Sequence, residues 1–126
     1  MDRRALTIGA VFGMLGVAIG AFGAHGLKEL LIANDRLDVF ETAVRYQFYH
    51  AFALLIVGVL AEKLQGLWVN RATLCFTLGV AIFSGSLYTL SITNVGWLGA
   101  ITPVGGVLII VGWIYLILGI VKSDQM

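Results

Sequence analysis

The sequence predicts an all-α fold: a bundle of four transmembrane helices with a short amphipathic helix in the first loop. Of its 126 residues, 60% are hydrophobic and only 12% charged, and the mean hydropathy of +0.97 is far above that of an ordinary soluble domain. A spanning helix needs about 20 mostly apolar residues, and four windows qualify: 5–24, 44–61, 72–91 and 104–121. Because these windows use most of the chain, we expect one integral membrane domain over residues 1–126.

The basic residues flanking the predicted spans indicate an orientation. Five lie on the side that holds both termini: Arg3, Arg4, Lys63, Arg71 and Lys122. Three lie on the opposite side, in or next to the first loop: Lys28, Arg36 and Arg45. Since cytoplasmic segments carry an excess of Lys and Arg, the distribution predicts that both termini are cytoplasmic.

Glycine recurs along the first span at spacings of three and four residues, which places the glycines on one helical face. They are Gly9, Gly13, Gly16, Gly20 and Gly23, and Gly26 continues the series. In lipid, small residues let two helix backbones approach closely. We therefore expect this face to pack on another helix of the chain or on a second copy, which makes a homo-oligomer through the glycine face a candidate assembly. A flexible or ligand-admitting helix is the alternative.

The first loop has a helical pattern of its own. Leu27, Leu30 and Leu31 recur at spacings of three and four residues, as in a short amphipathic helix at the membrane surface. Asn34 or Asp35 then supplies a suitable N-cap. The sequence predicts that a new helix begins there and continues through the second span.

The second span carries the most polar side chains. Its uninterrupted apolar run, residues 51–61, covers only about 17 Å of a hydrocarbon core near 30 Å. The preceding segment must therefore also lie at membrane depth, in the outer third, and it contains Tyr46, Gln47, Tyr49 and His50. Glu41 and Arg45 can pair at the surface, whereas Gln47 and His50 must point into the bundle or a wet cavity.

The third and fourth spans have their own patterns. Hydroxyl groups on one face of the third span can bond a neighbouring helix or their own backbone carbonyls; they belong to Thr73, Thr77, Ser84, Tyr88 and Ser91. In the fourth span, Thr102 and Pro103 predict an N-cap followed by proline at the first helical position. Glycine then repeats every seven residues, at Gly105, Gly112 and Gly119. Trp113 lies too deep in this span for a simple interface position.

All four spans contribute polar side chains on the side away from the termini, which predicts one polar layer. Its members are His25, Tyr46, Gln47, His50, Ser84, Ser86, Tyr88 and Thr102. An ionisable residue inside a membrane is a functional-site hypothesis. The two histidines could ligate a haem or metal, relay protons, or bind a lipid headgroup or quinone. The alternative is a hydrogen-bond network that sets helix register, with His25 only capping a helix end.

The sequence gives no support for a metal site, for the motifs of soluble enzymes or for nucleic-acid binding. No acidic residue lies at the depth of the layer and the histidines have no short-range ligand spacing, so we predict no metal site. Cys75 is the only cysteine, and no nucleophile elbow or phosphate-binding loop occurs, so no catalytic residue is assigned and no cofactor is identified. A formal charge of +1 without a basic run argues against nucleic-acid binding. Membrane lipids are the expected partners.

Four ordered segments carry a resemblance over almost the whole chain: GAFGAHGL, FETAVRYQFYHAFALL, FSGSLY and GAITPVGG. Together they resemble the DUF423 family of small membrane proteins. The resemblance implies a four-span protein, in bacteria of the inner (plasma) membrane, whose molecular activity is not established; some members are associated with envelope integrity. By position, the family's motif residues fall on Gly23, His25, Gly26, Thr42, Tyr46, Gln47, His50, Ser84, Gly85, Ser86, Tyr88, Thr102 and Pro103.

Three hypotheses of function follow. The first is a non-catalytic membrane protein that supports envelope integrity and can hold a lipid or other amphiphile in the polar layer. The second is a membrane enzyme or a haem- or quinone-binding protein that uses His25 and His50. The third is transport of protons or a small solute through the same layer, for which a wet path through the cytoplasmic half is required.

Overall fold

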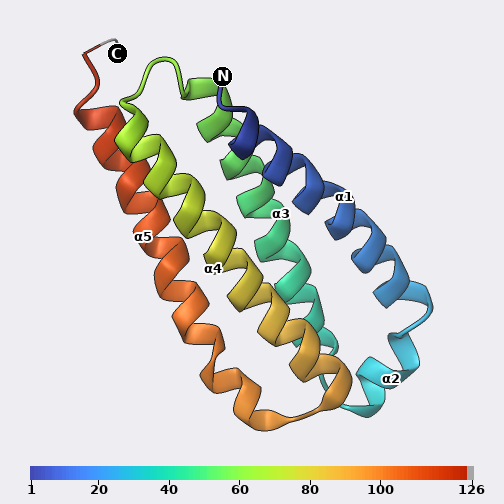
Figure 1. Cartoon of the computed structure of the whole chain (residues 1–126). Coiled ribbons are helices and arrows are strands. Elements are labelled where there is room, and N and C mark those ends of the chain that lie inside the picture. Colours follow the sequence, from blue (N-terminus) through green and yellow to red (C-terminus); the bar gives the residue numbers. More distant parts are fainter. Residues whose placement is uncertain (125–126) are drawn as a thin grey trace.

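The computed structural model describes residues 1–124 and confirms the all-α fold, with no strand in this part of the chain. The elements are α1 (Arg3–His25), α2 (Lys28–Ala33), α3 (Leu37–Leu60), α4 (Gly66–Thr93), the short 3-10 helix η1 (Gly96–Ala100) and α5 (Thr102–Val121) (Figure 1). The four long helices are long and apolar enough to cross a membrane. Each corresponds to one of the predicted spans, although α3 ends one residue before the second span does, and α2 is the expected short helix in the first loop.

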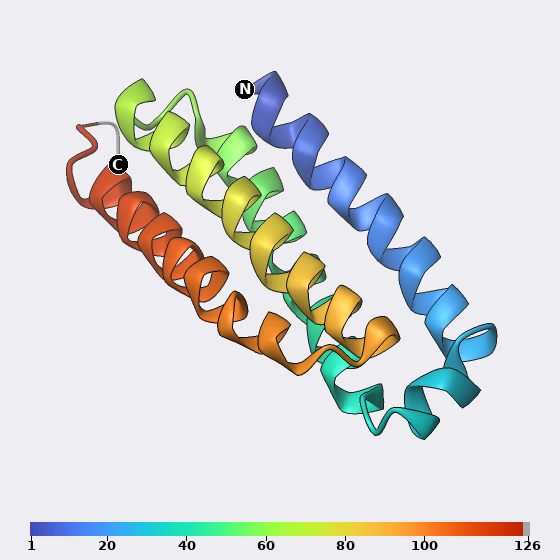
Figure 2. The same ribbon diagram turned by 60° about the horizontal axis from the view of Figure 1, so that its bottom comes forward.

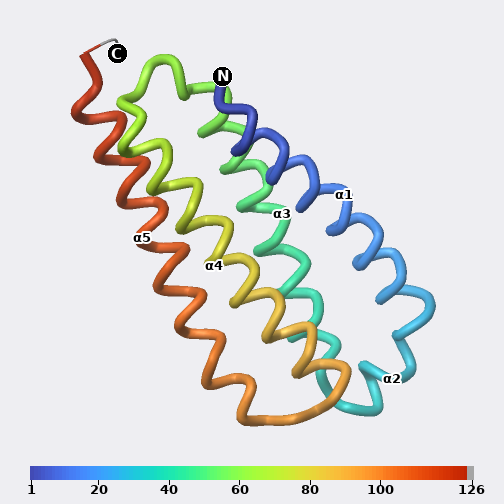
Figure 3. Tube along the Cα trace, viewed as in Figure 1, coloured from blue at the N-terminus to red at the C-terminus, as the bar shows by residue number. Residues whose placement is uncertain are grey.

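The long helices pack in series rather than as a closed ring. α1 packs on α3, α3 on α4 and α4 on α5, so α3 and α4 are the inner pair and α1 and α5 the outer pair (Figures 1 and 2). Consecutive long helices run in opposite directions along the Cα trace (Figure 3). Both termini and the α3–α4 turn therefore lie at one end, here called the terminal end, and α2 and η1 lie at the other, called the α2 end.

Close packing of α1 uses only part of its glycine face. Gly9, Gly16 and Gly23 are buried against α3, where Phe48 covers Gly16 and Phe40 covers Gly23. Gly13 faces open space: apart from its own stretch of helix, no heavy atom lies within 4 Å of the position a Cβ would take. Gly20 has only an ordinary contact with Val44. The helix that covers Gly9, Gly16 and Gly23 is thus α3 of the same chain.

Three of the four glycines of α5 pack closely on α4. Gly105 approaches the backbone of Phe83 and Gly79, Gly112 receives the Phe76 ring, and Gly119 packs on Trp68. The seven-residue glycine repeat of the fourth span thus follows one continuous seam. The apolar core next to this seam lies toward the terminal end and includes Ala5, Leu54, Val57, Val69, Phe76 and Leu116.

The predicted N-cap of α3 is wrong. Arg36 occupies the cap position, and Asp35 adopts a left-handed conformation with φ of 56°. Asn34 instead donates from Nδ2 to the carbonyls of Ser91 (3.0 Å) and Ile92 (3.2 Å) at the end of α4. The last carbonyls of a helix have no partner within the helix. Asn34 therefore hydrogen-bonds the end of α4, a contact that local sequence patterns do not predict.

Candidate functional site

Gln47 joins three of the four long helices. Its Nε2 donates to the backbone carbonyl of Phe12 in α1 at 2.8 Å, and its Oε1 accepts from the Tyr88 hydroxyl of α4 at 2.6 Å. The side chain is only 4% exposed. The amide thus has partners on both sides of α3, as a buried amide in an apolar interior requires.

Two serines of α4 make further hydrogen bonds, two of them to neighbouring helices. Ser84 donates to the carbonyl of Ala43 in α3 at 2.8 Å. Ser86 donates to the carbonyl of Phe83 at 2.9 Å and shares a 2.6 Å hydrogen bond with Thr102 at the start of α5. Because a serine hydroxyl has one proton, Thr102 is the donor in that second bond.

The expectation that Thr102 caps α5 with its side chain is therefore wrong. Ile101 is the cap residue, the first turn has no side-chain cap, and Pro103 is the second residue of the helix rather than the first. The Thr102 hydroxyl is engaged with Ser86 of the neighbouring helix. A hydroxyl at the start of a helix can hydrogen-bond the backbone of its own first turn or a group on a neighbouring helix. Here the packing of α4 against α5 selects the neighbouring helix.

His50 is held at both ring nitrogens. Nδ1 lies 2.7 Å from the carbonyl oxygen of Tyr46, and Nε2 accepts from the indole Nε1 of Trp113 in α5 at 3.0 Å. A carbonyl only accepts and an indole N–H only donates, so Nδ1 carries the proton and the imidazole is neutral. Trp113 was not among the residues predicted for the site. The only indication in the sequence was its position, which is too deep in the span for an interfacial tryptophan.

Aromatic rings surround this histidine. The ring centroids of Phe76, Trp113 and Tyr46 lie 5.6, 5.7 and 6.1 Å from that of His50, and Tyr46 also stacks on Phe83 at 4.6 Å. His50 lies near the midpoint of α3, which begins at Leu37. The predicted single layer is thus spread along the helix axis, from Thr102 at the α2 end to His50 at mid-length.

His25 stands apart from the other predicted site residues. It is exposed in the last turn of α1, and its imidazole makes no hydrogen bond to any residue that the structure describes. The neighbouring Gly23 packs on Phe40 of α3, and His50 lies ten residues further along α3, about 15 Å at 1.5 Å per residue. The structure does not bring the two histidines together.

A groove opens beside Gln47, between α1 and α4. Its volume is about 350 Å³ and its lining is almost entirely apolar. The lining residues are Ala18, Ile19, Phe22, Leu27, Phe40, Tyr88 and Ile92. The Tyr88 ring forms part of the wall while its hydroxyl is hydrogen-bonded to Gln47, so the polar atom of this residue already has a partner.

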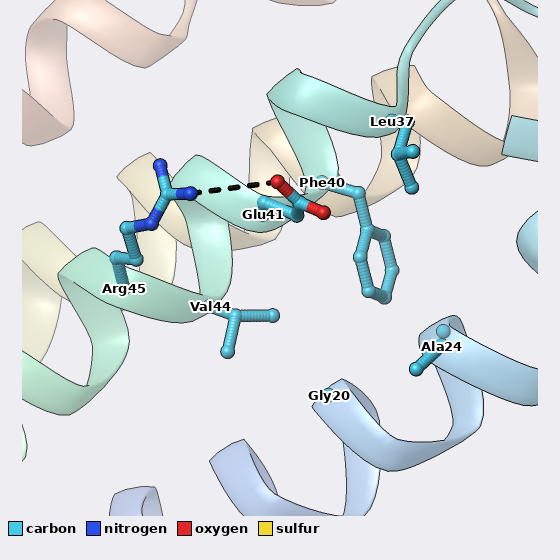
Figure 4. Close-up of a pocket in the computed structure, with 8 residues that line it drawn as sticks. Gly20, Ala24, Leu37, Phe40, Glu41, Val44 and Arg45 are labelled. Atoms are coloured by element: carbon cyan, nitrogen blue, oxygen red, sulfur yellow. Dashed lines mark hydrogen bonds and ion pairs between the residues drawn. The ribbon is translucent and has the colours of Figure 1, made fainter. Parts of the chain in front are cut away.

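A smaller pocket of about 170 Å³ lies on the α1–α3 interface (Figure 4). Gly20, Ala24 and Val44 form its apolar wall, and Glu41 and Arg45 form the predicted ion pair beside it, at 3.4 Å. Both charged side chains are more than half exposed, so the pair contributes about 0.5 kcal/mol at most. Among the described residues, no three His, Cys, Asp or Glu side chains form a group that could hold a metal ion.

Comparison with known proteins gives the family. The model of the family described as "Protein of unknown function (DUF423)" matches residues 19–106. The chain belongs to this family. It is 47% identical to the UPF0382 membrane protein YwdK of Bacillus subtilis over 93% of this chain and 95% of that protein. A UPF0382 membrane protein of Staphylococcus haemolyticus is 46% identical over 93% of this chain and 94% of its own length.

The names of these relatives state membrane association and no activity. No solved structure matches the chain. The resemblance to DUF423 and the assignment to a membrane are thereby confirmed for this four-span member of the family.

Proposed function

We propose that this DUF423 protein is a non-catalytic membrane protein that binds one phospholipid acyl chain in the groove between α1 and α4, and so supports the integrity of the cell envelope. The proposal places it in the bacterial plasma membrane with both termini in the cytoplasm. The observation that carries the proposal is the apolar groove of about 350 Å³ beside a polar network whose groups are bonded to one another.

The hydrogen bonds within the network support a structural role for its polar groups. Gln47 uses its donor and its acceptor on α1 and α4, and His50 uses both ring nitrogens. A general base or a metal ligand needs a nitrogen lone pair free for substrate or metal. At His50 that lone pair accepts the Trp113 indole proton, so the network orders helices rather than presenting a reactive group.

The position and lining of the groove favour an acyl chain as its occupant. Leu27 lies at the α2 end of the molecule, and Ala18 and Ile19 lie further along α1 toward the middle. A chain in the groove would therefore run from the membrane boundary toward the bilayer centre, as lipid chains do. Because the wall presents almost no polar surface, binding would rest on apolar contact and shape.

A redox or haem function that uses both histidines has less support. Two axial imidazoles must face one iron from opposite sides. His25 lies about 15 Å along the helix axis from His50, by the 1.5 Å rise per residue, and the His50 ring is enclosed by Phe76 and Trp113. Transport would need a wet path past this same aromatic cluster.

Native mass spectrometry of the detergent-purified protein tests the lipid proposal. Ala18→Trp should fill the groove, because Ala18 is part of its wall. Val17→Trp is the matched control, since Val17 is 63% exposed and lies outside the groove. We expect Ala18→Trp to retain one phospholipid fewer than the natural protein and the control. Equal lipid retention by all three proteins would refute the groove as a binding site.

A further inference from the structure

The terminal end carries a second feature, independent of the groove. Arg71 of α4 and Lys122 at the end of α5 converge on the same indole ring. The Arg71 Cζ lies 5.7 Å from the Trp68 ring centroid and the Lys122 Nζ lies 5.0 Å from it. Arg71 also lies 5.6 Å from the ring of Tyr115. We call Trp68, Arg71, Tyr115 and Lys122 the basic-aromatic cluster.

Neither cation of this cluster forms an ion pair with a residue that the structure describes. The ion pairs among the described residues join Glu41 to Arg45 and the terminal amino group to Glu62. Two like charges drawn to one ring repel each other, and a cation–π contact only partly offsets this. An anion that bridges Arg71 and Lys122 would remove the repulsion.

The depth of the cluster along the helices indicates which class of anion it would bind. Arg71 is five residues after the first residue of α4, and Tyr115 is six before the last residue of α5, so both lie within about 10 Å of a helix end. That is the level at which tryptophan and tyrosine meet lipid headgroups. Exposed aliphatic side chains of α5 continue from the cluster along the helix: Ile114, Ile117 and Val121.

The charge distribution between the two ends agrees with this placement. Five basic and three acidic residues lie at the terminal end, whereas three basic and four acidic residues lie at the α2 end. An anionic surface therefore attracts the terminal end and not the other. Within the terminal end, Arg71 and Lys122 are the cations held against aromatic rings.

We infer that the basic-aromatic cluster binds the phosphate of an anionic phospholipid, with Arg71 and Lys122 on the phosphate oxygens and the lipid chains along α5. The guanidinium can make two parallel hydrogen bonds to a phosphate, and the ammonium acts as a point charge. Trp68 positions both cations, since its ring is the contact they share.

The test is a titration with phosphatidylglycerol or phosphatidylcholine in detergent, read by native mass spectrometry. The double variant Arg71→Gln with Lys122→Gln should lose about tenfold or more of the preference for phosphatidylglycerol. The matched control is Arg4→Gln with Lys63→Gln, which removes two exposed charges from the same end. It should keep the preference, and circular dichroism should show unchanged helix content in both.

Three results would overturn the inference. An equal loss in the control pair would assign the preference to overall surface charge. Displacement of the lipid by millimolar inorganic phosphate would show a site for free phosphate rather than for a lipid. An unchanged preference in Trp68→Leu, which keeps both cations, would remove the role of the ring. None of these results bears on the groove, because no residue of the cluster lines it.

Discussion

The two outer helices attach to the inner pair by the same spacing of glycine but by different contacts. α1 uses Gly9, Gly16 and Gly23, and α5 uses Gly105, Gly112 and Gly119, each series at seven-residue intervals. On α1, two of the three glycines receive a phenylalanine ring of α3, and Gly9 approaches a single backbone atom, the carbonyl oxygen of Ala51. On α5, Gly105 lies against backbone atoms of two residues of α4, Phe83 and Gly79. A ring can turn to admit an extra methyl group, whereas two helix backbones can only move apart.

The largest effect should come from Gly105→Ala. A Cβ there would meet the backbone nitrogen of Phe83 and, at 2.8 Å, the carbonyl oxygen of Gly79. Since neither atom can move without shifting α4, we expect a loss of about 3 kcal/mol in the free energy of unfolding. Thermal unfolding in detergent, followed by circular dichroism, measures it. Gly106→Ala is the control, because a Cβ there would be 3.8 Å from the Phe83 ring; equal losses would contradict the backbone contact.

Gln47→Leu should have the next largest effect, because this side chain supplies polar links across the α1–α3 and α3–α4 interfaces. Without the amide, the Tyr88 hydroxyl loses its acceptor and the Phe12 carbonyl loses its side-chain donor. We expect a loss of about 2 kcal/mol by the same thermal measurement. The double variant with Tyr88→Phe should be no worse than Gln47→Leu alone, since the stranded hydroxyl is then gone. An additive loss would show that the two groups act separately.

Gly16→Ala sharpens the comparison with Gly105. The new Cβ would lie 2.9 Å from the far edge of the Phe48 ring. Because that ring can rotate outward toward lipid, we expect a loss of only about 1 kcal/mol, near the lower limit for overpacking. A loss as large as that of Gly105→Ala would show that the α1–α3 interface is as rigid as the α4–α5 interface.

The smallest effects should come from Gly13→Ala and Thr73→Val. Gly13 faces open space, so alanine adds helix propensity without a clash and should be neutral or stabilising by up to about 1 kcal/mol. Thr73 is 3% exposed, and its hydroxyl has no hydrogen-bond partner among the described residues. Valine removes that buried hydroxyl at similar volume, so unfolding should occur at an equal or slightly higher temperature. A clear loss at either position would reveal a contact absent from this structure.

Hydropathy and periodicity predict a large part of this fold. Span length follows from bilayer thickness, and three- and four-residue spacing follows from helix geometry, so the four long helices, α2 and the glycine seam of α5 were all predictable. The pairing of Glu41 with Arg45 was predictable for the same reason, since both residues lie on one helix. The polar residues of the second span were predicted to point inward, and Gln47 does so.

What the sequence by itself determined is therefore local: which segments are helices long enough to span, which faces are small or polar, and that Gln47 and His50 need partners. Tertiary structure decided the partners themselves. Trp113 meets His50 across 63 positions of the chain, and Asn34 meets the end of α4 across 57. The physical reason is that hydropathy and helical period act within one helix, whereas a hydrogen-bond partner depends on which helices pack side by side and at what height. That same packing buries Gly16, leaves Gly13 open and places His25 far from His50.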